Sequence, residues 1–589
     1  MCGIVGYVGA RPVQGLLLAG LEKLEYRGYD SAGISILSGE QVDSVRAVGN
    51  LQALRDAVAA LPLSAETPGG APVAVAEPTT GIGHTRWATH GRVSEENAHP
   101  HEDVEGRIHI VVNGIVENYM ALKRELADEG VVFTSETDAE VIAHVIARHY
   151  DGDLPAAVQA AYGEQFLASA VPAFLEHTRR VQFIEDGELV VLRPSGTEFL
   201  SAATGETVER DVVEVDWDAE TAEKGGYETF MLKEIHEQAD AVAETIADRT
   251  ARGDGIDLGD LGTIDDAFLR DVRRIIVVAC GTSYHAGLIG RYAIEGWARV
   301  PVEMDVASEY RYRNPVVGPG DLVIGISQSG ETADTLAAMR LARERGATVL
   351  AITNVMGSQA TRDADGVLFT RAGLEIGVAA TKTFVGQVAV MYVLALRLAE
   401  LRGTLEPARL TELVGELKRL PHHITEMLDA GDEEIRAIAE RHFEAEFFLY
   451  LGRHIGLPVA LEGALKLKEI SYIATDAYAA GEMKHGPIAL LDDDTPVVCV
   501  ATDSPVLEKV VSNIQEVRVR GAHVIAVASA GNEEIREHAE EVLTVAETDW
   551  MLAPLLAVVP LQLLAYHVAR LRGLNVDQPR NLAKTVTVE

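Results

Sequence analysis

The second half of the chain consists of short, uniformly apolar segments that alternate with helical segments, and this layout occurs twice. The apolar runs are Arg274–Ala279, Leu322–Ile326 and Thr348–Ile352 in the first copy, and Phe447–Leu451, Val497–Ala501 and Val524–Val527 in the second. Strands that are apolar on both faces need cover on both faces, as in a parallel sheet between two layers of helices. The pattern predicts two tandem α/β units, related in layout more than in sequence identity.

The first half is organised differently, with short strands, short helices and glycine-rich turns. Strand-like runs lie at Ile4–Val8, Ile108–Val112 and Val181–Ile184, and a helical pattern lies at Ala139–His149. The stretch Leu61–Thr80 is rich in Pro, Ala, Gly and Thr without periodicity, so we expect a loop insertion. The composition turns polar around Thr221–Glu228, before a helix begins near Tyr227, and we interpret this change as a domain boundary.

Charge and cysteine content exclude several classes of function. A formal net charge of −39 argues against nonspecific binding to nucleic acid or to an anionic membrane. We find no apolar run of about 18 residues and no secretion signal, so we expect no membrane span. Three cysteines make no disulfide framework and indicate a reducing, cytoplasmic location. The sequence has no CxxC pair and no HExxH motif, so we expect no dedicated metal site.

Cys2 is the first candidate for chemistry. It becomes the first residue if the initiator methionine is removed, and a small second residue favours that removal. It would then carry a thiol, with a pKa of about 8.5, and a free α-amino group, with a pKa of roughly 7.7–8.0. One residue could therefore supply both the nucleophile and the general base. The alternative is a small residue at the start of a buried strand.

Other polar residues of the first half are suited to binding an amino acid. The guanidinium fork of Arg86 can hold a carboxylate with two hydrogen bonds. Asn113 and Gly114 offer an amide side chain beside a backbone N–H, as an oxyanion hole requires. Asp138 lies at a predicted helix start, where its alternative role is a helix cap. With Cys2 as nucleophile, these residues form an inventory for hydrolysing the amide of an amino acid, with Arg86 on its α-carboxylate and Asp138 on its α-ammonium group.

In the second half, hydroxyl-bearing residues follow the apolar run that ends at Ile326. The residues of this stretch are Ser327, Gln328, Ser329 and Thr332. Hydroxyls and backbone N–H groups at a helix start make a phosphate cradle without cationic side chains, which suits so acidic a chain. The alternative is a simple helix cap. Thr282 and Ser283 follow the neighbouring strand and could reach the same ligand, because ligands bind at the carboxyl ends of such strands.

Two further features have an ordinary interpretation when each is taken alone. Glu462, Lys466 and Glu469 lie on one predicted helix at spacings of four and three, so they share a face. In an isolated helix this pattern is typical of a solvated ladder of ion pairs. Lys584, in the tail that contains Pro and Asn residues, would normally be a solvated lysine. Their functional interpretation depends on the rest of the chain.

These motifs resemble the glutamine–fructose-6-phosphate aminotransferase (isomerizing) family over nearly the whole chain. The matching segments are Met1–Gly6, Tyr26–Ser31, His84–Gly91, Asn113–Gly114, Glu136–Asp138, Cys280–Ser283, Ser327–Thr332, Leu461–Tyr472, Tyr478–Pro487 and Asn581–Glu589. The resemblance implies a multidomain protein of mixed α+β and α/β class. Its first part would be a glutaminase with the αββα Ntn-hydrolase sandwich, followed by two tandem sugar isomerase (SIS) domains, each an αβα sandwich around a parallel sheet. Ammonia would pass between the two parts.

For the glutaminase, the resemblance implies Cys2, Asn113 and Gly114 as catalytic residues. Glutamine would be held by Arg86, Thr89, His90 and Asp138. Trp87 matches the tryptophan that gates the ammonia channel in this family, and Tyr29 matches a tyrosine on the loop that covers the glutamine site.

For the SIS half, the resemblance implies that Glu469 is the base that moves a proton between C1 and C2 of the sugar, with Glu462 beside it. His485 would open the sugar ring, and it would reach into the site of the neighbouring subunit, so a homodimer is expected. Lys584 would form an imine with the open-chain ketose, which requires an uncharged amine. The sugar phosphate would be held by Thr282, Ser283, Ser327, Gln328, Ser329, Thr332, Val378 and Lys466.

The chain departs from the family pattern after Gly163. Gly163 to Phe166 joins directly to Leu167-Ala168-Ser169, and roughly thirty residues of interior strands are missing. Removing strands from a two-sheet sandwich exposes unpaired edges. We therefore expect a sandwich that closes in a shortened form, an impaired glutaminase, or a sequence that has lost a segment. The expected domains are a glutaminase at 1–225, a linker and helix at 226–265, SIS domains at 266–405 and 436–575, and an active-site tail at 576–589.

The reaction implied by the resemblance converts glutamine and fructose 6-phosphate to glutamate and glucosamine 6-phosphate, the first step of the hexosamine pathway, without a metal or redox cofactor. One alternative keeps the isomerase and uses free ammonia because glutamine hydrolysis is lost. Another, from a different class, is a sensor that binds a sugar phosphate without turnover. A sensor needs the serine-rich cradle but has no need of Glu469, His485 and Lys584 together.

Overall fold

The computed structural model describes the chain in segments. They are residues 3–25, 28–39, 41–60, 77–88, 91–113, 116, 119–149, 165–168, 177–178, 180–182, 184, 188–193, 196–201, 204, 206–214, 224–251, 255–259, 261–493 and 495–586. The chain divides into two compact units. Residues 1–223 and 583–588 form the first unit, and residues 224–582 with residue 589 form the second.

The first unit is centred on a five-stranded antiparallel sheet in the order β3-β2-β4-β1-β7. The strands are β1 Gly3–Val8, β2 Ser31–Ser38, β3 Gln41–Val48, β4 Thr80–Arg86 and β7 Gln165–Ala168. Helices α1 (Val13–Leu24) and α2 (Leu51–Ala59) join the sheet in one apolar core. Leu17, Leu21 and Leu24 recur at spacings of four and three along α1, so the helix presents one apolar stripe to the strands.

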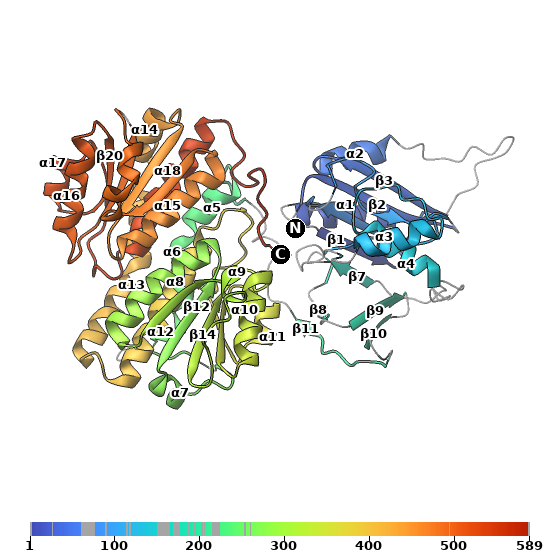
Figure 1. The fold of residues 1–589 in the computed structure, drawn as a ribbon, viewed down its shortest axis with the longest axis horizontal. Helices are drawn as coiled ribbons and strands as arrows, with labels where there is room; N and C mark the ends of the chain where they lie inside the picture. Colours follow the sequence, from blue (N-terminus) through green and yellow to red (C-terminus); the bar gives the residue numbers. More distant parts are fainter. Residues whose placement is uncertain are drawn as a thin grey trace. The chain divides into compact units, whose positions relative to one another are not determined.

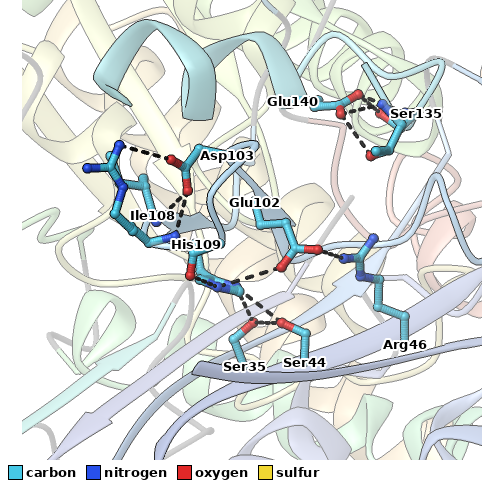
Figure 2. A network of polar contacts seen from close by, with 12 residues as sticks. Ser35, Ser44, Arg46, Glu102, Asp103, Ile108, His109, Ser135 and Glu140 are labelled. Carbon is cyan, nitrogen blue, oxygen red and sulfur yellow. Dashed lines mark hydrogen bonds and ion pairs between the residues drawn. The ribbon is translucent and has the colours of Figure 1, made fainter. Parts of the chain in front are cut away.

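A short hairpin is attached to the same sheet by polar contacts. It pairs β5 (His101–Glu102) with β6 (His109–Ile110). Nδ1 of His109 lies 3.1 Å from the hydroxyl oxygens of both Ser35 and Ser44, which belong to β2 and β3. Arg46 of β3 donates to Glu102 at 3.3 Å, as Figure 2 shows. Helix α4 (Glu140–His149) packs beside this hairpin, and α3 (Tyr119–Asp128) packs on α4.

The remaining strands of the first unit form two separate antiparallel pairs. They are β8 Arg180–Val181 with β11 Val213–Glu214, and β9 Glu188–Arg193 with β10 Gly196–Ser201. Within the described segments, the strands outside the five-stranded sheet therefore occur as three two-stranded pieces.

The second unit contains two five-stranded parallel sheets with the same strand order, the first strand lying second from the edge. The first sheet runs β13 Val302–Val306, β12 Arg274–Ala279, β14 Asp321–Ile326, β15 Thr348–Thr353 and β16 Gly366–Phe369. The second runs β18 Ala474–Ala479, β17 Phe447–Gly452, β19 Pro496–Ala501, β20 His523–Ser529 and β21 Glu541–Val545. The two parallel sheets confirm the predicted tandem α/β units.

Each strand contributes alternate residues to two cores, which explains why these runs are apolar throughout. In β12, Ile275 and Val277 belong to the core that includes α8 and α12, whereas Ile276 and Val278 belong to the core that includes α10. Figure 1 shows α8 and α12 on one side of β12 and β14, and α10 and α11 on the other. The first of these cores continues into the second sheet, so the two SIS domains share it.

The helices of the second unit follow the expected alternation. They are α5 Phe230–His236, α6 Gln238–Ile246, α7 Asp266–Asp271, α8 Gly281–Ala293, α9 Ala307–Tyr310, α10 Ala333–Glu344, α11 Gln359–Asp363, α12 Lys382–Arg402, α13 Pro407–Asp429, α14 Glu433–His442, α15 Gly456–Ser471, α16 Leu507–Arg518, α17 Glu533–His538 and α18 Pro554–Leu571. Helices α12 and α18 are long and apolar enough to cross a membrane by length and composition, which the sequence analysis did not anticipate. Both windows are 83% buried, because these helices form the shared core.

Several predicted boundaries in the first half were wrong. The expected strand Ile108–Val112 is only the two-residue β6, and Val181–Ile184 contributes only Val181 to β8. Thr80, predicted to end a loop, begins β4, whereas residues 61–76 of that predicted loop lie outside the described segments. These strands pair over two to seven residues, so the local pattern carries too little information to set their ends.

Candidate active sites

The strand order of the first SIS domain creates a crevice at the carboxyl ends of β12 and β14. The chain leaves these two adjacent strands toward opposite faces of the sheet, which opens a ligand-binding position between their loops. The loop after β12 carries Thr282 and Ser283 at the start of α8. The loop after β14 carries Ser327, Gln328, Ser329 and Thr332 and leads into α10.

The loop after β14 is folded by its own hydroxyl groups. The hydroxyl oxygens of Ser327 and Thr332 are 2.8 Å apart, and Ser327 also accepts from the backbone N–H of Gly330 at 3.1 Å. Gly330 has φ +67°, and a Cβ there would lie 2.0 Å from Oγ of Ser358, so only glycine fits. Thr332 occupies the N-cap position of α10 without a capping hydrogen bond from its side chain. The loop therefore gathers hydroxyls beyond what a helix cap needs, in favour of the cradle interpretation.

Two other predicted residues are held firmly in the same domain. The hydroxyl of Ser283 accepts a hydrogen bond from Nε2 of Gln387, on α12, at 3.0 Å. Val378 is buried, and its backbone N–H donates to the carbonyl of Asp577 at 3.0 Å. Asp577 also accepts from the backbone of Phe230 and Met231 at the start of α5. The start of the expected C-terminal tail thus contacts both α5 and the loop that carries Val378.

Glu462 joins the two SIS domains through polar contacts. Its Oε1 accepts from the hydroxyl of Thr282 at 3.0 Å, and its Oε2 lies 2.7 Å from Nδ1 of His285. Glu462 belongs to α15 of the second domain, whereas Thr282 and His285 belong to α8 of the first. The side chain of Glu462 has no exposed surface, so the interpretation as a solvated ion-pair ladder was wrong for this residue.

Lys466 lies between two carboxylates and is fully buried. Its Nζ is 3.4 Å from Glu462 and 2.6 Å from Glu469, and it donates to the hydroxyl of Thr282 at 3.2 Å. Burial by itself would lower the pKa of Lys466, but the charges of Glu469 and Glu462 outweigh it and raise the pKa to about 12. Lys466 is therefore a fixed cation at neutral pH, which suits charge stabilisation and excludes imine formation. Glu469 is 20% exposed, so one end of this network faces solvent.

The sequence analysis missed His285 as a member of this network. The residue lies three positions after Thr282 on α8, so both side chains point from one face of the helix toward Glu462. That spacing was the available signal. The spacing alone does not identify the network, because the carboxylate of Glu462 is 177 residues away in sequence and is brought to His285 only by the packing of α15 against α8.

The structure does not bring every predicted SIS residue into this network. His485 ends the short helix Glu482–His485, which follows β18, and its side chain is exposed. Lys584 belongs to the terminal segment 583–588, which groups with the first compact unit. Their proposed roles thus rest on the family resemblance.

In the first unit, Arg86 and Asp138 are both buried and both held by the backbone. The guanidinium of Arg86, at the end of β4, donates to the carbonyls of Gly91 and Arg92 at 3.4 Å each. The carboxylate of Asp138 accepts from the backbone N–H of Val116 at 2.8 Å. Val116 follows shortly after Asn113, so this contact ties Asp138 to the segment predicted to form the oxyanion hole.

The start of the chain is tied to β4 beside Arg86. Gly3, the residue after Cys2, pairs with Thr85, and its N–H donates to the hydroxyl of Thr85 at 3.1 Å. A Cβ on Gly3 would lie 2.7 Å from the side chains of both Leu24 and Thr85, so a side chain at this position would force the strands apart. The predicted site residues Cys2, Thr89, His90 and Gly114 lie outside the described segments.

Tyr29 and Trp87, predicted as the lid and the gate residue, are in contact. Their ring centroids are 5.9 Å apart at an interplanar angle of 84°, an edge-to-face arrangement. Asp30, the residue after Tyr29, also contacts the loop that carries Trp87, because its carboxylate accepts from the backbone N–H of Ala88 at 2.9 Å. A movement of Tyr29 would thus change the packing of the Trp87 ring.

Three buried histidines lie against one another in the first unit and make its stability sensitive to acid. His84 and His99 stack with centroids 4.2 Å apart, and His101 lies 4.4 Å from His99. Burial, as the largest cause, lowers the pKa of His84 from 6.5 to about 3 and that of His101 to about 4. The unfolded chain therefore binds more protons below pH 6.5, and the stabilisation present above that pH is lost as the pH falls.

We expect the first unit to lose roughly 1.5 kcal/mol for each of His84 and His101 between pH 6.5 and pH 5, because the loss approaches 1.36 kcal/mol per pH unit below the ordinary pKa of 6.5. Hydrogen exchange of β1, β2 and β4, corrected for the intrinsic rates, measures this loss. Strands β12, β14 and β15, which contain no histidine, are the internal control. Equal changes in both sets of strands would contradict the assignment.

Comparison with known proteins agrees with this architecture. A model of the glutamine amidotransferase domain matches residues 62–160, and a model of the SIS domain matches residues 268–397 and 447–572. A glutamine–fructose-6-phosphate aminotransferase [isomerizing] of Thermus thermophilus is 48% identical, and that of Caldanaerobacter subterraneus subsp. tengcongensis is 45% identical, each with both chains covered completely. Among solved structures, the C-terminal domain of the Francisella tularensis glucosamine-fructose-6-phosphate aminotransferase is 41% identical with a TM-score of 0.58, covering 60% of this chain and all of that one.

The lengths of these matches also bear on the shortened sandwich. The two full-length alignments span 623 and 624 positions, which is 34 and 35 more than the 589 residues of this chain. The size of this difference is similar to the roughly thirty residues that the family resemblance predicts to be missing after Gly163. Since the identity extends over both units and their full length, the chain belongs to the glutamine–fructose-6-phosphate aminotransferase (isomerizing) family.

Proposed function

We propose that this chain converts fructose 6-phosphate and glutamine to glucosamine 6-phosphate and glutamate. The observation that carries the proposal is the buried Thr282–Glu462–Lys466–Glu469 network beside the crevice of the first SIS domain. A module that only binds a sugar phosphate needs the hydroxyl cradle but no such buried charge network. The reaction needs no external oxidant, because the sugar is oxidised at one carbon and reduced at the next.

The phosphate group of the substrate binds at the loop after β14. Ser327, Ser329 and Thr332 bring three hydroxyls to the start of α10, where the helix dipole favours an anion. Thr282 and Ser283, at the start of α8, border the same crevice and contact the sugar. This arrangement lets a chain of net charge −39 bind an anion through local donors.

Glu469 is the base that transfers the proton between C1 and C2. Its carboxylate touches the fixed cation Lys466 and is partly exposed, so it is oriented on one side and accessible on the other. Lys466 is held in turn by Glu462, which His285 and Thr282 orient. His285 is thus a positioning residue, acting through Glu462.

Nitrogen enters through an imine on Lys584, after His485 has opened the sugar ring. Imine formation eliminates water between the amine of Lys584 and the C2 carbonyl, and ammonia then displaces the lysine. The exposed position of His485 supports a role in the site of a neighbouring subunit, and the active protein is therefore a homodimer. No metal or redox cofactor takes part in these steps, and the enzyme acts in the cytoplasm.

Ammonia comes from glutamine hydrolysed at Cys2. The thiol attacks the side-chain amide and expels ammonia to give a thioester, which water hydrolyses to glutamate and the free thiol. Asn113 and Gly114 hold the oxyanion, and Arg86 and Asp138 hold the α-carboxylate and the α-ammonium group. Thr89 and His90 complete the glutamine site. The contact between Tyr29 and Trp87 supports a coupling of glutamine binding to the gate of the ammonia channel.

A second candidate is a synthase that uses free ammonia because its glutaminase is impaired. Two observations favour this candidate. The described strands outside the five-stranded sheet form three two-stranded pieces, and the alignments leave 34 to 35 positions unmatched. The two candidates differ in one assay. Product formed with glutamine supports the first, whereas product formed with ammonium alone supports the second.

Cys2→Ala is expected to reduce glutamine-dependent synthesis by at least about a thousandfold and to leave ammonium-dependent synthesis unchanged, because the nucleophile is lost while the SIS unit is intact. Product assays with each nitrogen source measure both activities. Cys499→Ala, at a buried cysteine in β19, is the matched control and should retain both. Retained glutamine-dependent synthesis in Cys2→Ala would refute the role of Cys2.

A further inference from the structure

Three side chains that could bind a metal converge in the second SIS domain, away from the residues described above. They are His442, His523 and Glu541, and their ligand atoms all lie within 4.8 Å of one another. Nε2 of His442 is 3.3 Å from Oε2 of Glu541, and Nε2 of His523 is 3.5 Å from Oε1. Ligand atoms around a tetrahedral zinc ion are about 3.3–3.4 Å apart, given metal–ligand bonds of about 2.0–2.1 Å.

The facing atoms of this cluster have no hydrogen-bond partner. Nε2 of His442, Nε2 of His523 and Oε2 of Glu541 are all buried, and none of the three has an aligned donor or acceptor. The separations are short enough for hydrogen bonds, but without alignment such bonds contribute little. Buried polar atoms normally make at least one hydrogen bond, so three close buried atoms that make none point to a common ligand.

The three residues belong to elements whose backbones are already fixed. His442 is the last residue of α14, His523 is the first residue of β20, and Glu541 is the first residue of β21. The backbone N–H of His523 donates to the carbonyl of Thr495 at 2.9 Å. Glu541 pairs with Ile525 in the parallel ladder between the two strands. Binding an ion would therefore require little further ordering of the backbone at these three residues.

The cluster lies at the amino ends of β20 and β21, whereas the sugar crevice lies at the carboxyl ends of strands. An ion here would cross-link α14 to two neighbouring strands and would take no part in the sugar chemistry. The expectation of no metal site rested on CxxC and HExxH motifs. It could not detect ligands that are separated by 81 and 18 residues in the sequence and brought together only by the fold.

We propose that His442, His523 and Glu541 bind one divalent transition-metal ion of the Zn²⁺ type, as a structural site. Two imidazoles and one carboxylate suit zinc and similar ions, and water would fill the fourth position. Arg441 pairs with Oε1 of Glu541 and helps to orient the carboxylate, whose Oε2 lies nearest Nε2 of His442 and whose Oε1 lies nearest Nε2 of His523.

A cavity of about 210 Å³ borders the cluster on the side of Glu541. Its charged lining residues are Glu434, Glu540, Glu541, Arg441 and Arg536. The ring of Phe448 lies against His442 in an edge-to-face contact, with centroids 6.3 Å apart, and closes the apolar side of the site.

Zinc binding to the full-length protein tests the proposal. The chain is treated with a chelator, and Zn²⁺ alone is then added in isothermal titration calorimetry, with Co²⁺ absorption as a second probe of the coordination geometry. We expect one high-affinity ion per chain and a rise in the unfolding temperature when Zn²⁺ is present. His442→Ala and His523→Ala should weaken binding more than about 100-fold and remove the shift in unfolding temperature.

Two further variants make the test decisive. Glu541→Gln keeps the size of the side chain and should also lose Zn²⁺ binding, so a loss in all three variants does not depend on one that folds poorly. His422→Ala is the matched control, because His422 forms an exposed pair with Glu426 and should bind Zn²⁺ as the unaltered chain does. An unaltered chain that binds no Zn²⁺, or ligand variants that bind it unchanged, would overturn the proposal.

Discussion

Replacing Lys466 with methionine is expected to abolish synthesis and to lower the free energy of unfolding of the SIS unit by about 3–5 kcal/mol. The variant leaves the fully buried Glu462 without its nearest cation and leaves Glu469 without the partner at 2.6 Å. An unpaired buried carboxylate either stays charged at a large desolvation cost or takes up a proton, and a protonated Glu469 cannot act as a base. Methionine keeps the apolar stem, so the change reports on the charge.

Urea unfolding and product assays measure the two parts of this expectation. Lys468→Met is the matched control, because Lys468 lies on the same helix but is exposed, and we expect its effects on stability and activity to be small. A Lys466→Met protein as stable and as active as the unaltered chain would show that the buried charge network is dispensable, and it would remove the main support for the catalytic interpretation of Glu469.

Replacing Lys584 with alanine is expected to reduce synthesis by at least about a thousandfold with either glutamine or ammonium as the nitrogen source, while any glutaminase activity is retained. The reason is chemical. Lys466, the other lysine of the predicted sugar site, has a pKa raised to about 12 and is therefore unable to form the imine in place of Lys584. Lys584→Arg should be equally inactive, because a guanidinium keeps the charge but forms no imine.

Borohydride reduction gives an independent readout of the same role. The unaltered chain incubated with fructose 6-phosphate and borohydride should gain the mass of one reduced sugar phosphate, and Lys584→Ala should gain none. Val586→Ala, at a 53% exposed position in the same tail, controls for disturbance of the tail itself. Synthesis retained in Lys584→Ala, or a sugar adduct on another lysine, would refute the imine role.

Some features of this protein follow from local sequence alone. The run Arg274–Ala279 coincides with β12, because a short run rich in β-branched apolar residues favours a strand that is buried on both faces. The hydroxyl-rich stretch after Ile326 falls at a strand end for the same reason, since the strand before it is so clearly bounded. The order of these elements then predicts tandem parallel sheets, because uniformly apolar strands that alternate with helices form a parallel sheet covered on both faces.

Other features were decided only by tertiary structure. On sequence, the pattern of Glu462, Lys466 and Glu469 is that of an exposed ladder, and it is the packing of α15 against α8 that buries it and raises the pKa of Lys466. His285 and the cluster of His442, His523 and Glu541 likewise acquire their partners from distant segments. The sequence by itself thus determined the strands and the positions of the motifs, because these depend on local hydrophobic pattern. The burial of a side chain, its charge state and its hydrogen-bond or ion-pair partners depend on which residues pack against it. Only the three-dimensional fold determines those residues.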